Sequence, residues 1–169
     1  MAKPFKKFLD HYNAYFEKVY RYIFFRVGRN KELAEDMTSE IFLKALEKYG
    51  DFDHNRPFAV WIYRIAHNHL VDFYKKVKFE MMDIEEVANE IRAKGNLVDE
   101  LETRLNSGSV TEVLEDLPRL QKEVIVMKYV NDLTNPEIAE ILDTNEAHVR
   151  VLHHRALQWL KTRLSFVTV

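Results

Sequence analysis

The sequence predicts an all-α protein made of two small helical domains joined by an acidic linker. Gly and Pro number only four each among 169 residues, which favours helices over turn-rich sheets. Apolar residues recur at helical spacing in the first and last thirds of the chain, and only weakly between them. We therefore expect domains at residues 1–78 and 111–169, with the linker at residues 79–110.

Composition narrows the class of protein. The chain has no cysteine, which excludes disulfide frameworks, thiolate metal sites and a cysteine nucleophile. No apolar run reaches membrane-spanning length, and the Lys-containing N-terminus lacks a signal-peptide core. We expect a cytoplasmic protein without membrane insertion.

The net charge is −2, but positive and negative residues are distributed unevenly along the chain. Residues 1–78 hold 15 Lys/Arg against 10 Asp/Glu, and residues 79–117 hold 3 against 11. Residues 118–169 are nearly balanced, with 7 against 6. A basic first block can attract nucleic acid even though the whole chain is slightly acidic.

The first domain should contain three helices. Apolar residues three or four apart run from Phe5 to Val27 and predict the first helix, which Gly28 ends. Asn30 can cap a second helix from Lys31 to Tyr49, and Gly50 stops it. Residues 51–56 then form a polar loop that leads through Pro57 into a helix to Lys78, with Asn55 as its cap.

The third helix has two contrasting faces. Its apolar stripe consists of Phe58, Trp61, Ile62, Ile65, Leu70, Phe73 and Val77. The other face carries Arg64, His67, Asn68, Lys75, Lys76 and Lys78, with Tyr63 and Tyr74 beside them. Cations attract phosphates, while aromatic rings and amides suit unstacked bases, so this face favours a strand of nucleic acid. The alternative is a core helix with a solvated basic side.

The last third predicts a helix-turn-helix. Leu117-Pro118 opens a helix to Val130, and residues 134–137 (TNPE) form a capping box that starts a short helix through Leu142. Asn145 caps the final helix. The motif requires a small residue where the two helices pack, and Ala139 is in that position. It also requires a turn residue that tolerates positive φ, here Asp143, and a buried apolar anchor in the second helix, here Val149. An ordinary helical hairpin is the alternative.

The final helix would present polar residues to a DNA major groove. In that geometry Arg150 can pair with guanine and Val151 can contact a thymine methyl group. No HExxH, Gly-rich phosphate loop or nucleophile elbow occurs. The histidine pairs 67/69 and 153/154 point in different directions on a helix, so we expect no metal site, no cofactor, no small-molecule substrate and no catalysis.

Four blocks of residues together resemble a known family. They are AEDMTSEIFLKAL (34–46), FAVWIYRIAHNHLVDFYKK (58–76), LPRLQKEVIVMKYVNDLTNPEIAEIL (117–142) and VRVLHHRAL (149–157). In this order they are similar to bacterial sigma factors of the extracytoplasmic-function (ECF) type in the sigma-70 family, which keep only regions 2 and 4. The resemblance covers nearly the whole chain apart from the linker and the extreme N-terminus.

The resemblance implies a promoter-specificity factor with three sets of site residues. Contact with the β′ coiled coil of core RNA polymerase falls on Asp36, Met37, Ser39, Glu40, Phe42 and Leu43. Recognition of the −10 promoter element falls on His54, Asn55, Arg56, Trp61, Arg64, Asn68, Lys75 and Lys76. Recognition of the −35 element falls on Asn145, His148, Arg150, Val151, His154 and Arg155. The segment 117–130 would meet the polymerase β flap, and an anti-sigma factor is a further implied partner.

The sequence departs from the family pattern at a few positions. Ser39 replaces the usual Gln, and Asp143 replaces the turn glycine. Ala147-His148 and Val151-Leu152 stand where Gly-Thr and Ser-Arg are more common, which removes a cation from the expected DNA face. Two other readings therefore stay open: a stand-alone helix-turn-helix regulator, and a sigma-like protein that binds core polymerase but reads promoters poorly.

Overall fold

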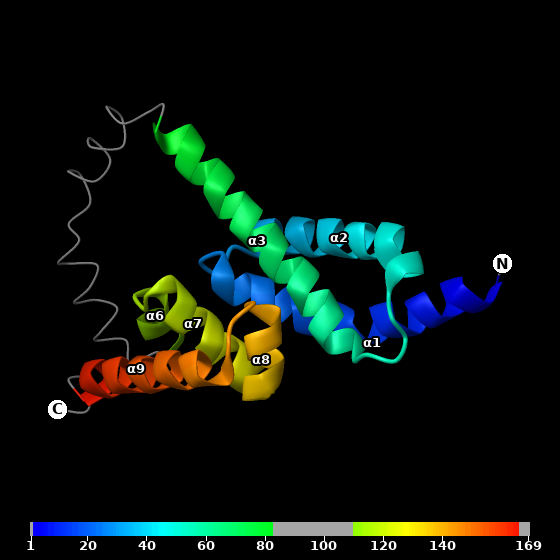
Figure 1. Cartoon of the computed structure of the whole chain (residues 1–169). Helices are drawn as coiled ribbons and strands as arrows, with labels where there is room; N and C mark the ends of the chain where they lie inside the picture. Colours follow the sequence, from blue (N-terminus) through cyan, green and yellow to red (C-terminus); the bar gives the residue numbers. More distant parts are fainter. Residues whose placement is uncertain (1, 83–109, 166–169) are drawn as a thin grey trace.

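The computed structural model describes residues 2–82 and 110–165, and every regular element within these ranges is a helix (Figure 1). The N-terminal unit comprises α1 (Ala2–Arg26), α2 (Lys31–Lys48) and α3 (Phe58–Met82). The C-terminal unit comprises α6 (Val110–Glu115), α7 (Arg119–Ile125), α8 (Asn135–Ile141) and α9 (Glu146–Ser165). The predicted all-α class is confirmed. None of the described helices combines the length and apolarity that a bilayer crossing requires.

The turns of the N-terminal unit follow local sequence signals with two corrections. Gly28 has φ of 64°, and the Asn30 side chain caps α2 by accepting a hydrogen bond from the Leu33 amide, as predicted. Helix α2 ends at Lys48, one residue before the predicted end, but Gly50 is not the stop, because it lies inside a 3-10 turn (η1, Tyr49–Asp51) that continues from α2. Helix α3 begins at Phe58, two residues later than a cap at Asn55 would place it. The loop is instead held by Asp53, whose carboxylate accepts a hydrogen bond of 2.9 Å from the Asn55 amide.

The C-terminal unit contains the predicted helix-turn-helix. Thr134 and Glu137 form the reciprocal capping box at the start of α8. Asp143 adopts φ of 53° in the turn, so an Asp serves where the family more often has Gly. Ala139 and Val149 are both buried at the contact between α8 and α9. The helix expected over residues 118–130 is α7 followed by a π-helical turn (η2, Val126–Val130).

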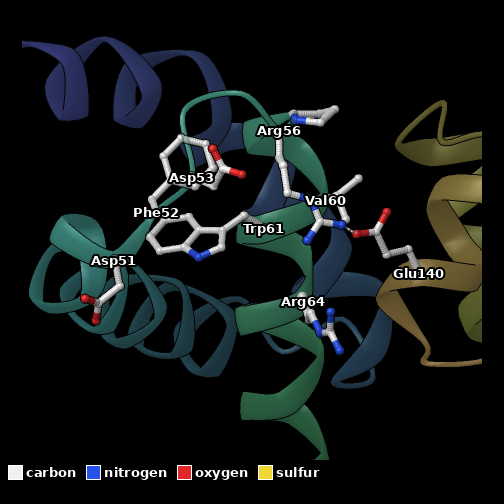
Figure 2. A pocket seen from close by; sticks show the side chains of 9 residues that line it. Asp51, Phe52, Asp53, Arg56, Val60, Trp61, Arg64 and Glu140 are labelled. Carbon is white, nitrogen blue, oxygen red and sulfur yellow. Dashed lines mark ion pairs between the residues drawn. The ribbon is translucent and has the colours of Figure 1, made fainter.

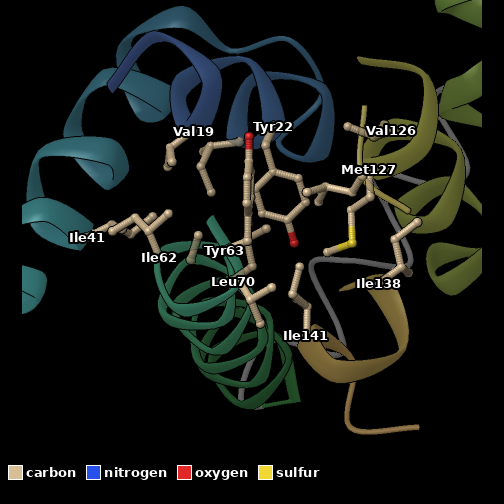
Figure 3. Close-up of a cluster of buried hydrophobic side chains, with 14 of the residues drawn as sticks. Val19, Tyr22, Ile41, Ile62, Tyr63, Leu70, Val126, Met127, Ile138 and Ile141 are labelled. Atoms are coloured by element: carbon tan, nitrogen blue, oxygen red, sulfur yellow. The ribbon is translucent and has the colours of Figure 1, made fainter. Parts of the chain in front are cut away.

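The two units pack against each other rather than standing apart. Figure 3 shows one apolar core built from both, in which α1 and α3 face η2 and α8. Its labelled members from the N-terminal unit include Val19, Tyr22, Ile62, Tyr63 and Leu70, and those from the C-terminal unit are Val126, Met127, Ile138 and Ile141. A smaller core joins α6 and α7 to α9, through Val113, Leu114, Leu117, Ile125, Ala156 and Leu160.

This packing corrects the sequence interpretation of one side of α3. Tyr63, His67 and Tyr74 were expected beside the exposed basic face. Tyr63 is instead 1% exposed, and its hydroxyl accepts a hydrogen bond of 2.9 Å from the Asn131 side chain of the C-terminal unit. Tyr74 donates to the backbone carbonyl of Arg26. Residues 63, 67, 70 and 74 follow helical spacing. Tyr63 and Leu70 are buried and His67 and Tyr74 are partly buried, so this side of α3 is covered instead of facing solvent.

The predicted linker is mostly outside the described residues. The one or two helices that the sequence predicts there fall on residues 83–109. At its edges, α3 continues through Met82 and α6 begins at Val110.

Two residues of α2 allow a matched test of this core. Ile41 is fully buried, whereas Leu43 on the same helix is 62% exposed. Ile41→Ala should lower the free energy of unfolding by about 2–5 kcal/mol, because it leaves a cavity among close-packed side chains. Leu43→Ala should change it by no more than about 0.5 kcal/mol. Urea titration followed by circular dichroism measures both, and equal effects would contradict the assigned burial.

Candidate nucleic-acid interface

A hollow of about 150 Å³ lies where the 51–57 loop meets α3 (Figure 2). Its walls come from the loop, from the first two turns of α3 and from α8. The lining residues are Asp51, Phe52, Asp53, Arg56, Pro57, Val60, Trp61, Arg64 and Glu140. The structure thus brings together three residues that the sequence analysis assigned to −10 recognition, namely Arg56, Trp61 and Arg64.

Trp61 provides the aromatic surface of this hollow. Its ring centroid is 4.9 Å from that of Phe52 and 5.5 Å from that of Phe58, and both of these neighbours are buried. Trp61 itself is only partly buried, so some of its ring remains open to the hollow. His54 packs edge-on against Phe52 at 5.0 Å. Rings fixed by such packing offer a base a stacking surface without loss of side-chain freedom.

Cations and an amide continue from the hollow along α3. Arg56 and Arg64 are exposed, and Figure 2 shows their guanidinium groups on the side where α8 approaches. Asn68, one turn beyond Arg64, is also exposed, as are Lys75 and Lys76. Positions 64, 68 and 75 share one side of a helix, so they form a track that a phosphate backbone could follow.

The C-terminal unit contributes an acidic residue that sequence reasoning missed. Glu140 of α8 reaches into the hollow and its carboxylate forms an ion pair with the Arg56 guanidinium (Figure 2). The two side chains are 58% and 37% exposed. They are 84 residues apart in sequence, and nothing in the local pattern around either residue signals the contact.

The second candidate surface is the outward side of α9. His148, Arg150, Val151, His154 and Arg155 are all exposed there, as the helix-turn-helix predicts. The Asn145 carboxamide oxygen caps the helix through a 2.8 Å bond from the His148 amide, which leaves its amide nitrogen available to donate to DNA.

One departure from the family pattern has a structural explanation. Leu152 is only 6% exposed and belongs to the core between the two units. Its side chain therefore packs inward and adds no group to the outward side of α9. Arg150 lies 3.6 Å from Glu146 of the same helix, a weak surface pair that DNA could displace.

The third predicted set, on α2, divides into surface and core. Asp36, Ser39, Glu40 and Leu43 are exposed, whereas Met37 and Phe42 are 3% and 4% exposed. A hollow of about 300 Å³ between α1 and α2 is lined by Phe8, Tyr12, Phe16, Ser39, Phe42, Leu43 and Leu46. An apolar groove beside exposed carboxylates is typical of a protein-binding surface with a charged rim.

Glu40 also links α2 to α3. Its carboxylate lies 2.9 Å from His69 Nε2, while His69 Nδ1 lies 2.8 Å from the Lys44 ammonium group. Burial and the positive charge of Lys44 lower the pKa of His69, and Glu40 counteracts them only in part. Among residues 2–82 and 110–165, no group of three His, Asp or Glu side chains is arranged to hold a metal ion.

Comparisons with known proteins match both units separately. A family model described as "Sigma-70 region 2" matches residues 11–80, and one described as "Sigma-70, region 4" matches residues 107–160. The ECF RNA polymerase sigma factor SigW of Bacillus subtilis is 32% identical over 93% of this chain and 88% of its own length. The ECF RNA polymerase sigma factor BldN of Streptomyces coelicolor is 33% identical over 88% of this chain, which spans only 57% of that relative.

Two solved structures share the fold. The sigma factor RpoE of Bartonella quintana, solved in complex with the anti-sigma factor NepR, has a TM-score of 0.73 at 16% identity and covers 95% of this chain and 98% of its own. CnrH, solved with the cytosolic domain of CnrY, has a TM-score of 0.63 at 21% identity, with 95% and 87% covered. At these identities the likeness concerns the arrangement of helices.

Proposed function

The chain belongs to the ECF sigma factors of the sigma-70 family, and we propose that it acts as a dissociable promoter-specificity subunit of bacterial RNA polymerase. The hollow at the start of α3 is the observation that supports this most directly. It combines a fixed aromatic ring with flanking guanidinium groups, in the unit that matches region 2. We refer to α1–α3 as region 2 and to α6–α9 as region 4 from here on.

Region 2 would read the −10 element as opened single strand. Trp61 lies at the mouth of the hollow, where a base turned out of the duplex could stack on its accessible ring. Arg56 and Arg64 would hold the phosphates on either side of that base. Asn68 carries a donor and an acceptor one turn away, which suits reading a base edge. The cost of unstacking would thus be met by stacking and by phosphate contacts.

Region 4 would read the −35 element as duplex. Arg150 and Val151 lie on the outward side of α9, where they can meet the edges of a base pair in the major groove. His148 and His154 stand at exposed positions where Lys or Arg would add a full positive charge, so phosphate attraction from this helix alone is modest. Affinity would therefore depend on both regions acting together on one polymerase.

Core polymerase would bind the exposed side of α2. Asp36 and Glu40 provide negative charge at its rim, and Leu43 with the groove between α1 and α2 provides apolar contact. The β′ coiled coil is the expected partner there, and the β flap is the expected partner of segment 117–130. In this role the chain performs no catalysis itself and works in the cytoplasm. An anti-sigma factor is a further expected partner, since RpoE of Bartonella quintana, which shares the fold, was solved with one.

The proposed function is tested by run-off transcription with purified core RNA polymerase and a library of promoter sequences. We expect specific transcripts only when the chain is added, because core polymerase alone does not select start sites. A stand-alone regulator would support no transcription, and a degenerate sigma factor would bind core without initiating. Either result would contradict the proposal.

Asn68→Ala and Arg64→Ala test the role of α3. Each removes one polar contact to the opened strand, worth about 1–3 kcal/mol, so open-complex formation should fall by about five- to 150-fold. Binding to core polymerase should not change. Lys6→Ala, which removes an exposed cation of α1, is the matched control and should leave both properties as they are. Permanganate footprinting measures opening, and equal opening in the variants would exclude this role.

Charge reversal on α2 tests the polymerase surface. Asp36→Lys combined with Glu40→Lys should weaken binding to core by more than about hundredfold, since like charges placed at an interface cost several kcal/mol. Glu32→Lys combined with Glu47→Lys reverses two other exposed carboxylates of the same helix and serves as the control. Co-elution with core on size exclusion gives the readout. Because Glu40 contacts His69, thermal unfolding of each variant must also be compared.

A further inference from the structure

A histidine of α1 packs against both ends of the 51–57 loop. The His11 ring is stacked on Phe58, with the ring centroids 4.0 Å apart and the planes within 4° of parallel. Its centroid is also 6.2 Å from that of Tyr49 and 6.2 Å from that of Phe52, both in edge-on contacts. Tyr49 and Phe52 stand at the start of the loop and Phe58 directly follows its end. One side chain of α1 therefore contacts the chain on both sides of the loop.

The same three rings support Trp61 in the hollow. The Trp61 centroid is 4.9 Å from Phe52, 5.5 Å from Phe58 and 6.2 Å from Tyr49, and Figure 2 shows Phe52 beside the indole. All three supporting rings are buried. Close-packed side chains transmit a displacement to their neighbours, so the placement of the His11 ring bears on the placement of the Trp61 ring.

Hydrogen bonds set the local shape of the loop. The Arg56 amide donates to the Asp53 carbonyl at 3.0 Å, and the Asn55 amide donates to the Asp53 carboxylate at 2.9 Å. Both bonds join residues within the loop, and neither reaches α1. The ring contacts of His11 are thus what sets the position of the loop against α1.

The surroundings of His11 favour its unprotonated ring. Burial lowers the pKa of His11 below its ordinary value of 6.5, a positive charge on His54 lowers it further, and Asp10 counteracts them in part. Asp10 faces the ring from α1, His54 faces it from the loop, and Tyr49 of η1 is the titratable ring in contact with it. Protonation would therefore place a charge where the packing favours none.

We propose that His11 is a positioning residue for −10 recognition: its ring, stacked on Phe58, holds the 51–57 loop and Trp61 in the geometry that receives the turned-out base. The inference rests on the proposed function, because this geometry matters only if the hollow reads an opened strand. His11 acts through the rings between it and the hollow and does not itself contact DNA. A stacking surface that is fixed before binding loses less conformational freedom when a base arrives.

Loss of the His11 ring should reduce selectivity for the −10 sequence. His11→Ala removes the ring and keeps a residue that favours the helix. Permanganate footprinting of the holoenzyme measures opening on the promoter selected by run-off transcription and on copies with one base changed. The ratio of the two is the discrimination at that base. Discrimination at −10 should fall by about two- to tenfold, as for loss of one aromatic pair, and discrimination at −35 should stay the same.

Two further variants serve as controls. His11→Phe keeps an aromatic ring that can stack on Phe58, so it should restore the discrimination of the parent at neutral pH. His153→Ala is the matched control, because His153 of α9 is also partly buried beside an aromatic ring, that of Tyr129 at 5.7 Å, but belongs to region 4. Its loss should leave discrimination at −10 at the parental level.

The pH dependence is a readout that a purely structural ring would not alter. Because the pKa of His11 in the native protein lies below 6.5, the stabilisation by its unprotonated ring is complete above that value and is lost as pH falls through the native pKa. Discrimination at −10 by the parent should therefore fall between about pH 7.5 and about pH 5.5. His11→Phe cannot bind a proton and should keep its discrimination, and dividing the two values at each pH removes the response of the polymerase.

The outcomes separate the positioning role from the proposed function. An equal loss of opening on every promoter, or no loss on any, would leave both discrimination ratios unchanged and would overturn the positioning role. A pH response that persists in His11→Phe would also overturn it, because another group would then be the source. Absence of transcription from the parent would overturn the promoter-specificity role and the positioning role with it. If His11→Ala does not fold, the pH series of the parent and His11→Phe decides, since both keep the ring.

Discussion

The contact between Glu123 and the three region 2 side chains Tyr22, Arg26 and His67 governs how the rest of the molecule is arranged. Apolar surfaces alone would let two small helical units slide over each other, because hydrophobic attraction has no direction. Hydrogen bonds and ion pairs are directional, so a buried anion with a tyrosine, an arginine and a histidine as partners favours the geometry in which all three reach it. That geometry places η2 and α8 on α1 and α3, and it brings Glu140 to the hollow.

Helix α3 has two sides with different surroundings: one is exposed, and the other packs against region 4. Its outward side presents Arg64 and Asn68 beside Trp61, while residues 63, 67 and 70 on another side pack on region 4. Since both sides belong to one rigid helix, anything that binds strongly along the outward side near Arg56 must compete with α8. If α3 binds DNA as proposed, recognition of DNA and association of the two regions would be coupled by geometry, with no need for a change inside either region.

Sequence signals that involve neighbouring residues correctly predicted the helix caps and the turn. The Asn30 cap, the Thr134–Glu137 capping box and the positive φ of Asp143 each involve residues a few positions apart, and the structure contains all three. The hollow was also foreseeable in part, because Arg56, Trp61 and Arg64 lie within nine residues. The family resemblance supplied the roles expected of these residues, which spacing by itself did not.

The sequence by itself determined the all-α class, the helix-turn-helix and the residues around the hollow, because helix periodicity, caps and turns depend on neighbours in the chain. Only the tertiary structure decided that Tyr63 and His67 face inward, that Met37 and Phe42 lie in the core, and that Glu123 and Glu140 meet region 2. When a helix has apolar residues on more than one side, its sequence does not determine which side packs against which neighbouring helix. Pairs more than fifty residues apart, such as His67 and Glu123, are set by how whole helices pack, and packing depends on every surface at once.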